Sequence, residues 1–293
     1  MKRNHASSVV RFGMVFCLAV FAVAAGARAA FATDIVTQAR DTLPEAIKNS
    51  GVLRLATALQ WPPFAYANDR SEAEGIDIEL ITLLSAKLGL KLELTNLKFP
   101  SIIPGVTSGR FDVGMDQLGR TPEREKVVQF VVYFRSALGL LVRKGAPDVD
   151  VYHLCGRTLA LTQGSSQIAV AQRLSDACVK EGKQAISFQF YPASADSYLA
   201  VSKGRGDGFL TGRAVGVYIA SHDDKLHMTK PTLPETSELA GIVIAKDNDQ
   251  LAKAVRLALE SAIEDGSYTK ILEKYDAAEG TLTLSEVRDP PGH

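Results

Sequence analysis

Residues 109–126 read GRFDVGMDQLGRTPEREK, a stretch in which a short apolar run gives way to polar residues. Residues 111–115 predict a strand of a buried sheet, after which Asp116 and Gln117 begin a loop. A short helix is expected just before this strand, at residues 101–108. A buried strand that follows a helical segment in this way indicates an α/β protein.

Strands and helices alternate on both sides of this stretch. Before it, residues 52–58 and 91–97 predict strands, and residues 76–88 have apolar positions at helical spacing. A break at residues 144–147 (KGAP) opens a second α/β series, with strands at 158–162, 186–191 and 207–211 and helices at 165–179, 195–203 and 214–221. A strand at 239–245 and helices at 251–263 and 267–275 complete the pattern.

The two series predict two α/β lobes connected by two crossings, near residues 137–144 and 229–240. Lobe 1 would comprise residues 33–137 and 240–293, and lobe 2 residues 138–239 with the hinge crossings. The segment after Asp276 is polar and ends in Asp289-Pro290-Pro291, so we expect it to be loosely held.

The composition excludes several classes of protein. The chain has 293 residues, of which 46% are hydrophobic, and this proportion is typical of a globular protein. Because 33 basic residues balance 33 acidic ones, a nucleic-acid-binding protein, which usually has a basic excess, is disfavoured. The sequence has no CxxC pair that would suggest zinc and no nucleotide-binding loop, so we expect no metal and no cofactor.

The N-terminal segment resembles an export signal. Lys2, Arg3 and Arg11 precede an apolar run, residues 12–26, and the sequence Ala30-Phe31-Ala32 follows as an A-x-A cleavage site. Residues 1–32 are therefore expected to be a signal peptide, cleaved after Ala32 or, alternatively, after Ala29. A membrane anchor is the other interpretation, although the run is short beside the roughly 20 residues that span a bilayer.

Export has a consequence for the cysteines. Of the three in the chain, Cys17 lies in the signal segment, which leaves Cys155 and Cys178. In an oxidising compartment such a pair tends to close, so we expect a Cys155–Cys178 disulfide. Two buried thiols are the alternative.

Six segments together resemble a known family. In chain order they are GIDIEL (75–80), GRFDVGM (109–115), TPEREK (121–126), QGSSQ (163–167), GRGD (204–207) and DGSYTKIL (265–272). Their content and order resemble the periplasmic polar amino-acid-binding proteins of ABC importers, the bacterial extracellular solute-binding family 3, from about residue 43 to residue 275. The resemblance implies the type II periplasmic binding protein fold, in which two α/β lobes joined by two hinge strands close over a small ligand.

The resemblance also implies a carboxylate site. Arg124 matches the arginine that grips the ligand carboxylate, and its planar guanidinium can offer two parallel donors. The alternative is a surface arginine paired with Glu123 or Glu125. Ser165 and Ser166 match positions that meet the same carboxylate, and their hydroxyls could also cap the helix that they open.

Further positions match the lining of the family's cleft. Trp61 and Phe99 match aromatic wall positions that enclose the ligand side chain, with core packing as the alternative, and Thr162 matches another lining position. Asp116, Gln117 and Gly119 follow the strand at 111–115, where relatives use small or hydroxyl residues and backbone groups on the ligand. For Asp116, the alternative is a salt bridge near the hinge.

Two positions depart from the family pattern. Ala58 stands where many binders of cationic amino acids have Asp, and Gly212 where binders of α-amino acids usually have the Asp that takes the ammonium group. Arg213 stands next to the latter. An unpaired buried charge is costly, so the sequence predicts weak binding of standard amino acids, unless Asp116 replaces the missing carboxylate.

The sequence thus predicts a monomeric periplasmic protein that captures a small carboxylate-bearing solute, an amino acid or a similar molecule, and delivers it to a membrane ABC permease. We expect no enzymatic activity and no nucleic-acid partner. Two alternatives remain: an accessory protein of a periplasmic dehydrogenase system, and a periplasmic dehydratase on the same fold. The mature histidines, His153, His222, His227 and His293, match no segment of the cleft, which disfavours the dehydratase.

Overall fold

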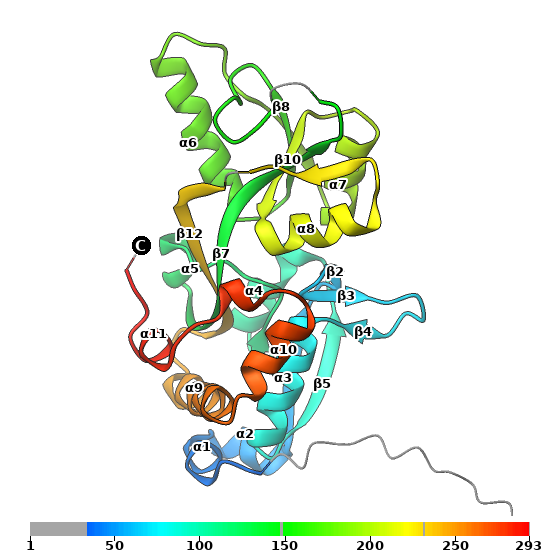
Figure 1. The fold of residues 1–293 in the computed structure, drawn as a ribbon. Helices are drawn as coiled ribbons and strands as arrows, with labels where there is room; N and C mark the ends of the chain where they lie inside the picture. Colours follow the sequence, from blue (N-terminus) through cyan, green and yellow to red (C-terminus); the bar gives the residue numbers. More distant parts are fainter. Residues whose placement is uncertain (1–33, 147–148, 231, 293) are drawn as a thin grey trace, which may run out of the picture. The chain divides into compact units, whose positions relative to one another are not determined.

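The computed structural model describes residues 34–146, 149–230 and 232–292. The expected signal peptide lies outside the described residues. Two α/β series are connected by long strands, as Figure 1 shows. Within the described part of the chain, none of the helices has the length and apolar character needed to cross a membrane.

One sheet runs through both series, in the order β5-β1-β6-β12-β7-β10-β8-β9. In the first series, β1 (Val52–Thr57) is parallel to β5 (Lys91–Asn96) and to β6 (Val113–Gly114). In the second series, β8 (Thr158–Thr162) is parallel to β9 (Ser187–Tyr191) and to β10 (Gly208–Gly212). Parallel strands of this kind need helical crossovers, which the alternating sequence pattern supplies.

The helices of the first series bury apolar faces against each other and against the sheet. They are α1 (Thr37–Thr42), α2 (Glu45–Ser50), α3 (Ile76–Lys87), α4 (Ile102–Thr107), α9 (Asp249–Glu264) and α10 (Ser267–Lys274). On α9, Leu251, Val255 and Leu259 are fully buried, as their i,i+4 spacing predicts. The Asn248 side chain accepts a hydrogen bond from the Leu251 N–H and caps this helix.

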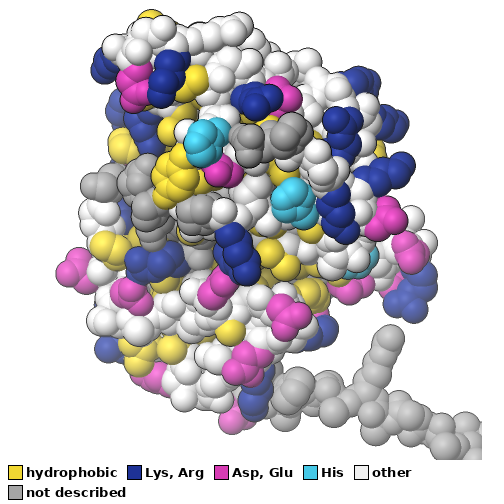
Figure 2. Space-filling model, turned by 45° about the horizontal axis from the view of Figure 1, so that its top comes forward, with side chains coloured by type: hydrophobic (Ala, Val, Ile, Leu, Met, Phe, Trp, Pro, Cys, Tyr) yellow, Lys and Arg dark blue, Asp and Glu magenta, His cyan; other side chains and the backbone are white. Residues whose placement is uncertain are grey.

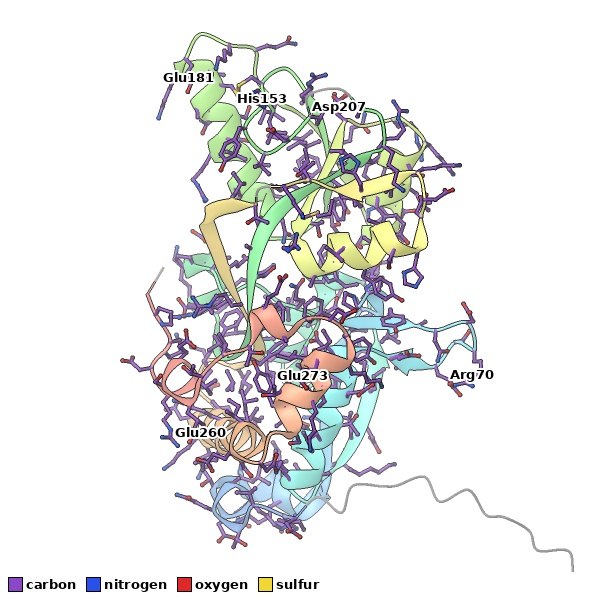
Figure 3. All side chains as sticks on the ribbon, viewed as in Figure 1. Arg70, His153, Glu181, Asp207, Glu260 and Glu273 are labelled. Atoms are coloured by element: carbon purple, nitrogen blue, oxygen red, sulfur yellow. A yellow bond between two sulfur atoms is a disulfide. The ribbon has the colours of Figure 1, made fainter. Side chains whose placement is uncertain are left out.

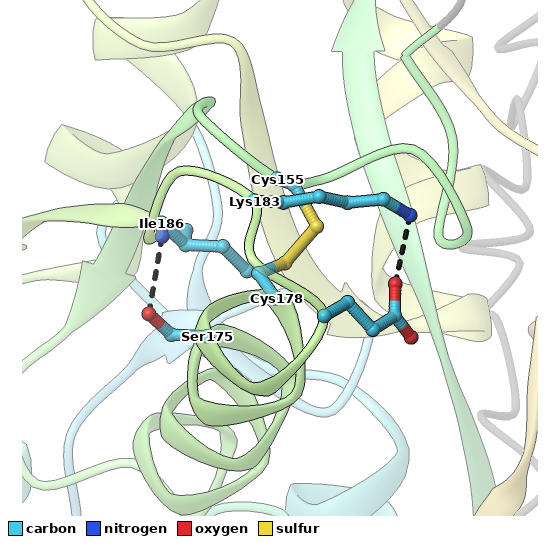
Figure 4. Close-up of a disulfide and its surroundings, with 6 residues drawn as sticks. Cys155, Ser175, Cys178, Lys183 and Ile186 are labelled. Atoms are coloured by element: carbon cyan, nitrogen blue, oxygen red, sulfur yellow. Dashed lines mark hydrogen bonds and ion pairs between the residues drawn. A yellow bond between two sulfur atoms is a disulfide. The ribbon is translucent and has the colours of Figure 1, made fainter.

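The second series has its own core and contains the predicted disulfide. Its helices are α6 (Gln167–Lys180), α7 (Ser194–Ser202) and α8 (Arg213–His222). Figure 4 shows the Cys155–Cys178 bond, which joins α6 to the segment before β8. Beside it, the Ile186 N–H donates a 3.0 Å hydrogen bond to Ser175 Oγ. The prediction of a disulfide is confirmed.

Two long antiparallel strands connect the series. The strand β7 (Val128–Arg143) has 16 residues and β12 (Leu233–Ala245) has 13, and the two pair along most of their length. The pairing shifts register between Leu233 and Glu238. A short strand, β11 (Leu226–Met228), pairs with the far end of β7. The first crossing, expected near residues 137–144, is therefore the second half of a longer strand.

The C-terminal segment is ordered, so the expectation of a loose tail is wrong. It forms η2 (Ala278–Gly280) and α11 (Leu284–Arg288), which has a capping box between Thr283 and Glu286. Leu282 and Val287 are buried, and Arg288 donates to Glu260 on α9 at 2.8 Å. The buried Leu282 and Val287 side chains and the Arg288–Glu260 ion pair thus connect this short polar segment to the first series.

A small separate sheet projects from the first series. It consists of β2 (Gln60–Trp61), β3 (Ala65–Ala67) and β4 (Ala73–Glu74). Figure 3 shows Arg70 at the tip of the β3–β4 hairpin, away from the helices. The base of this hairpin places Trp61 beside the loop that follows β6.

Candidate functional site

The loop after β6 leads into α5 (Pro122–Glu125), a short helix that positions Arg124. Thr121 caps this helix by accepting a 3.3 Å hydrogen bond from the Arg124 N–H, and Pro122 occupies its first position. The guanidinium then reaches both series: Nη1 donates to Gly119 O at 2.6 Å and Nη2 to Gly164 O at 2.8 Å. Since a guanidinium has five N–H donors, others remain available to a ligand.

A carboxylate faces this arginine from the hinge strand β12. Glu238 is partly buried, and its carboxylate lies against Gly119, where any side chain would overlap it. Burial raises the pKa of Glu238, while the nearby Ser166 hydroxyl and the Arg124 charge act in the opposite direction. Burial also lowers the pKa of Arg124, against the effect of Glu238.

Aromatic rings form the wall next to Arg124. The rings of Trp61 and Phe99 are stacked with centroids 6.2 Å apart and planes 19° apart, and Arg124 lies over the Phe99 ring at 6.0 Å. Phe209, from β10 of the second series, meets Trp61 edge-on at 6.2 Å. Trp61 is 4% exposed and Phe99 8%, so both rings are largely protected from water.

Gln117 connects this wall to the start of α8. Its Oε1 accepts a 2.6 Å hydrogen bond from Trp61 Nε1, which leaves its Nε2 directed elsewhere. That nitrogen lies 3.4 Å from the position that a Cβ on Gly212 would take, and the Ser136 hydroxyl lies 2.6 Å from the same position. Gly212 therefore borders a small polar region rather than a bulky side chain.

Two buried carboxyl groups lie beneath the loop. Asp77 accepts from Tyr133 Oη at 2.6 Å and from the Gln117 N–H at 2.7 Å. Asp116 Oδ1 accepts from the Thr57 hydroxyl at 3.4 Å, and its Oδ2 has no hydrogen-bond partner among the described residues. Burial raises the pKa of Asp77 to about 7, and burial together with Asp77 raises the pKa of Asp116 well above its ordinary value.

The hydroxyl groups of Ser165 and Ser166, at the start of α6, do not cap this helix as the sequence predicts. Ser166 is the N-cap, but in helical conformation and without a side-chain capping bond, so the predicted capping role of its hydroxyl is wrong. The reason is its orientation toward Glu238. The Ser165 hydroxyl is buried without a partner among the described residues, and the Thr162 hydroxyl pairs with Ser197 at 3.2 Å.

The chain matches the model of the bacterial extracellular solute-binding proteins, family 3, over residues 53–278. That match covers most of the chain and contains every residue of the site described above. The chain belongs to this family. Its members are solute-binding proteins, and all six segments that resemble this family lie within the matched range.

The individual relatives share only a low sequence identity with this chain. The arginine-binding protein ArgT of Corynebacterium glutamicum is 22% identical, with 88% of this chain and 85% of the relative covered. The L-cystine-binding protein TcyJ of Escherichia coli K12 is 25% identical, with 80% and 86% covered. The similarity extends over most of the length of both relatives.

Solved structures confirm the two-lobed fold. An ancestral arginine-binding protein bound to arginine has a TM-score of 0.70 and 28% identity, covering 77% of this chain and 98% of the other. The ancestral amino-acid-binding protein AncCDT-1, a precursor of cyclohexadienyl dehydratase, has a TM-score of 0.71 and 26% identity, covering 79% and 98%.

The family positions predicted from the sequence are mostly brought together. The contacts described above connect seven of these residues, namely Arg124, Trp61, Phe99, Gln117, Gly119, Ser166 and Gly212. Thr162 and Ser165 lie at the adjoining end of β8. Asp116 is directed toward Thr57, and Arg213 pairs with Glu279 at 3.4 Å.

The sequence did not identify Glu238, Phe209 or Ser136 as site residues. Glu238 stands in a segment that predicts only a crossing between lobes, and no motif marks it. The only signal in the sequence for Glu238 is that a charged residue stands directly before an apolar strand.

Among the described residues, no cluster of three or more His, Cys, Asp or Glu side chains could hold a metal ion. On the face drawn in Figure 2, charged side chains of both signs are interspersed.

Proposed function

We propose that this protein is the solute-capturing component of an ABC importer and that it binds a small carboxylate-bearing solute of the amino-acid class between its lobes. The single observation that carries the proposal is the position of Arg124. Its guanidinium spans Gly119 in one series and Gly164 in the other, beside an aromatic wall. A carboxylate bound there would hold both lobes at once, which couples ligand capture to closure.

The relatives support this class of ligand. Those compared above carry names that state binding of arginine, L-cystine or amino acids. We propose that residues 1–32 direct export to the periplasm, that the mature protein is a monomer, and that a membrane permease is its partner. The ligand contacts would come from Arg124, the rings of Trp61 and Phe99, Ser165 and Ser166, and the backbone around Gly119.

The test is mass spectrometry of the small molecules released when freshly purified protein is denatured. Recovery of an intact carboxylate-bearing molecule, bound again by the ligand-free protein in calorimetry, is the expected result. A dehydratase would instead convert a supplied substrate to product. An accessory protein would co-purify with a periplasmic dehydrogenase and release no small molecule, an outcome that would overturn the transport proposal.

A further inference from the structure

Hydrogen-bond donors gather at the start of α8, and no carboxylate is among them. The polar atoms nearest to the position that a Cβ on Gly212 would take are Ser136 Oγ, at 2.6 Å, and Gln117 Nε2, at 3.4 Å. Gly212 is the N-cap of α8, and no side chain caps this helix of 10 residues. The backbone N–H groups of its first turn are therefore further donors at the same place.

The amide of Gln117 is oriented with its donor end toward Gly212. Its Oε1 accepts the 2.6 Å hydrogen bond from Trp61 Nε1, and an indole nitrogen can only donate. The NH2 group is therefore the end that lies near Gly212. An amide NH2 group donates and does not accept, so this end of the side chain can bind an acceptor but not a cation.

The Ser136 hydroxyl at the same place is buried without a partner. Ser136 lies on the hinge strand β7 and is 6% exposed, and its Oγ has no hydrogen-bond partner among the described residues. Buried polar groups are nearly always hydrogen-bonded in folded proteins, because an unpaired one is costly. A solute atom that pairs with Ser136 Oγ would remove this cost.

These donors adjoin the aromatic wall beside Arg124. Trp61 stacks on Phe99, and Arg124 lies over the Phe99 ring. Arg124 donates to the carbonyl of Gly119, which is two residues from Gln117, so the Cα atoms of these two loop residues are at most about 7 Å apart. A solute carboxylate on Arg124 would therefore bring the carbon next to it close to Gln117.

The nearby carboxyl groups are directed elsewhere. Asp116 Oδ1 accepts from the Thr57 hydroxyl at 3.4 Å, beneath the loop. Glu238 borders a cavity that Arg120 and Arg173 also line, and that lining includes none of the aromatic rings of the wall. An ammonium group among the donors near α8 would therefore lack an acceptor carboxylate, and an unpaired buried charge is costly.

We infer that the solute has an oxygen acceptor, and not an ammonium group, on the carbon next to the carboxylate that Arg124 binds. The class that fits is the 2-oxo acids, which have the carbon skeleton of an amino acid with a carbonyl in place of the amine. This inference rests on the proposed function and names the ligand class of the same site. The carbonyl oxygen would accept from Gln117 Nε2 and from the Ser136 hydroxyl, so Gln117 is the residue that determines specificity.

The experiment compares wild type with Gln117→Glu by calorimetry at neutral pH. The substitution keeps the shape of the side chain and the acceptor for Trp61 Nε1, but replaces the donor with a carboxylate oxygen. The probes are matched pairs: pyruvate with L-alanine, phenylpyruvate with L-phenylalanine, and 2-oxoglutarate with L-glutamate. In the pair that binds best, we expect wild type to prefer the 2-oxo acid at least about tenfold, and Gln117→Glu to shift that ratio toward the amino acid at least about tenfold.

Two further variants separate specificity from folding. Ser136→Ala should weaken the 2-oxo acid about three- to tenfold, because one donor to the carbonyl oxygen is lost. Gln38→Glu makes the same chemical change as Gln117→Glu at an exposed position on α1, and it should leave the ratio unchanged. Circular dichroism verifies the folding of each variant. If Gln117→Glu does not fold, Ser136→Ala decides, and an unchanged affinity for the 2-oxo acid in that variant would overturn the inference.

The remaining outcomes separate this inference from the proposed function. A wild type that binds the amino acid of its best pair at least as tightly as the 2-oxo acid would overturn the inference and leave the proposed function intact. An unchanged ratio in folded Gln117→Glu would do the same. If no probe binds, the molecule released from denatured protein decides: a 2-oxo acid supports the inference, and a carboxylate with an amine on that carbon overturns it, as does one without oxygen there. If no molecule is recovered, the proposed function fails and the inference fails with it.

Discussion

The indole N–H of Trp61 donates a 2.6 Å hydrogen bond to the side-chain oxygen of Gln117. Because an indole nitrogen can only donate, this bond fixes which end of the amide faces the ring. Gln117 is held at its other end too: its backbone N–H donates to Asp77, and its φ is +46°. The aromatic wall and the loop that carries Arg124 are thus connected through one side chain.

Replacement of Gln117 by Ala should lower the free energy of unfolding by about 1–3 kcal/mol, the cost of leaving a buried donor unpaired. Trp61 is 4% exposed, so water cannot easily replace the lost acceptor. Urea unfolding followed by fluorescence measures the change, since Trp61 is the only tryptophan in the chain. Gln172→Ala, on the exposed face of α6, is the control. Equal effects of the two substitutions would show that the Trp61–Gln117 bond does not stabilise the fold.

Removal of the Arg124 side chain should weaken binding by roughly 2–5 kcal/mol, because one partner of a desolvated charge pair is lost. At about 1.4 kcal/mol per decade, this corresponds to at least about thirtyfold in Kd. Calorimetry of Arg124→Ala with the recovered ligand measures it. Arg70→Ala, at the exposed hairpin tip, should have no effect. A loss smaller than threefold in Arg124→Ala would exclude Arg124 as the carboxylate partner.

The alternation of strands and helices could be predicted because each buried element has its own periodic pattern. Leu251, Val255 and Leu259 mark one face of a helix without any knowledge of the rest of the chain. The C-terminal segment has no such pattern. Leu282 and Val287 become buried only because α9 and β7 provide a surface for them, so its order depends on contacts that the local sequence does not encode.

The candidate site likewise combines contacts within one local motif, which the sequence predicts, with contacts between distant segments, which it does not. Arg124 and Gly119 lie in one motif, so their proximity follows from a short loop and a helix cap. Glu238 meets Gly119 because β12 pairs with the loop after β6, where Gly119 and Ala240 form an antiparallel bridge and the Arg120 N–H donates to Leu239 O at 2.7 Å. This pairing joins segments more than a hundred residues apart, so no local pattern in the sequence predicts the contact.

The buried carboxyl groups predict a pH-dependent stability. Burial raises the pKa of Asp77 to about 7 in the folded protein, above its ordinary value of 3.8, and raises that of Asp116 as well. The unfolded chain therefore releases these protons at lower pH than the folded chain does. The stability that these groups contribute is complete below about pH 4 and is lost as the pH rises toward and through 7.

Asp116→Asn should make this dependence visible. The amide has the shape of the acid but does not ionise, so the variant should be more stable than wild type at pH 8, with the difference shrinking toward pH 4. Urea unfolding from pH 4 to pH 8 measures the difference, and Asp69→Asn, at an exposed position, should show none. A difference that stays constant with pH would mean that Asp116 ionises in the folded protein as readily as in the unfolded chain.

Ligand binding should favour closed lobes in solution. Arg124 and Trp61 each contact the second series, through Gly164 O and Phe209 respectively, and these contacts must separate for a solute to enter between them. The ligand-free protein should therefore sample open arrangements about β7 and β12, and a carboxylate on Arg124 should shift the population toward closure. Small-angle scattering should show a smaller radius of gyration with ligand, at concentrations where Trp61 fluorescence shows saturation.

The radius of gyration of Arg124→Ala should stay unchanged at the same ligand concentration, which separates closure from a general effect of the solute. An unchanged radius in saturated wild type would mean that the site fills without movement of the lobes, and that the coupling through Arg124 is absent.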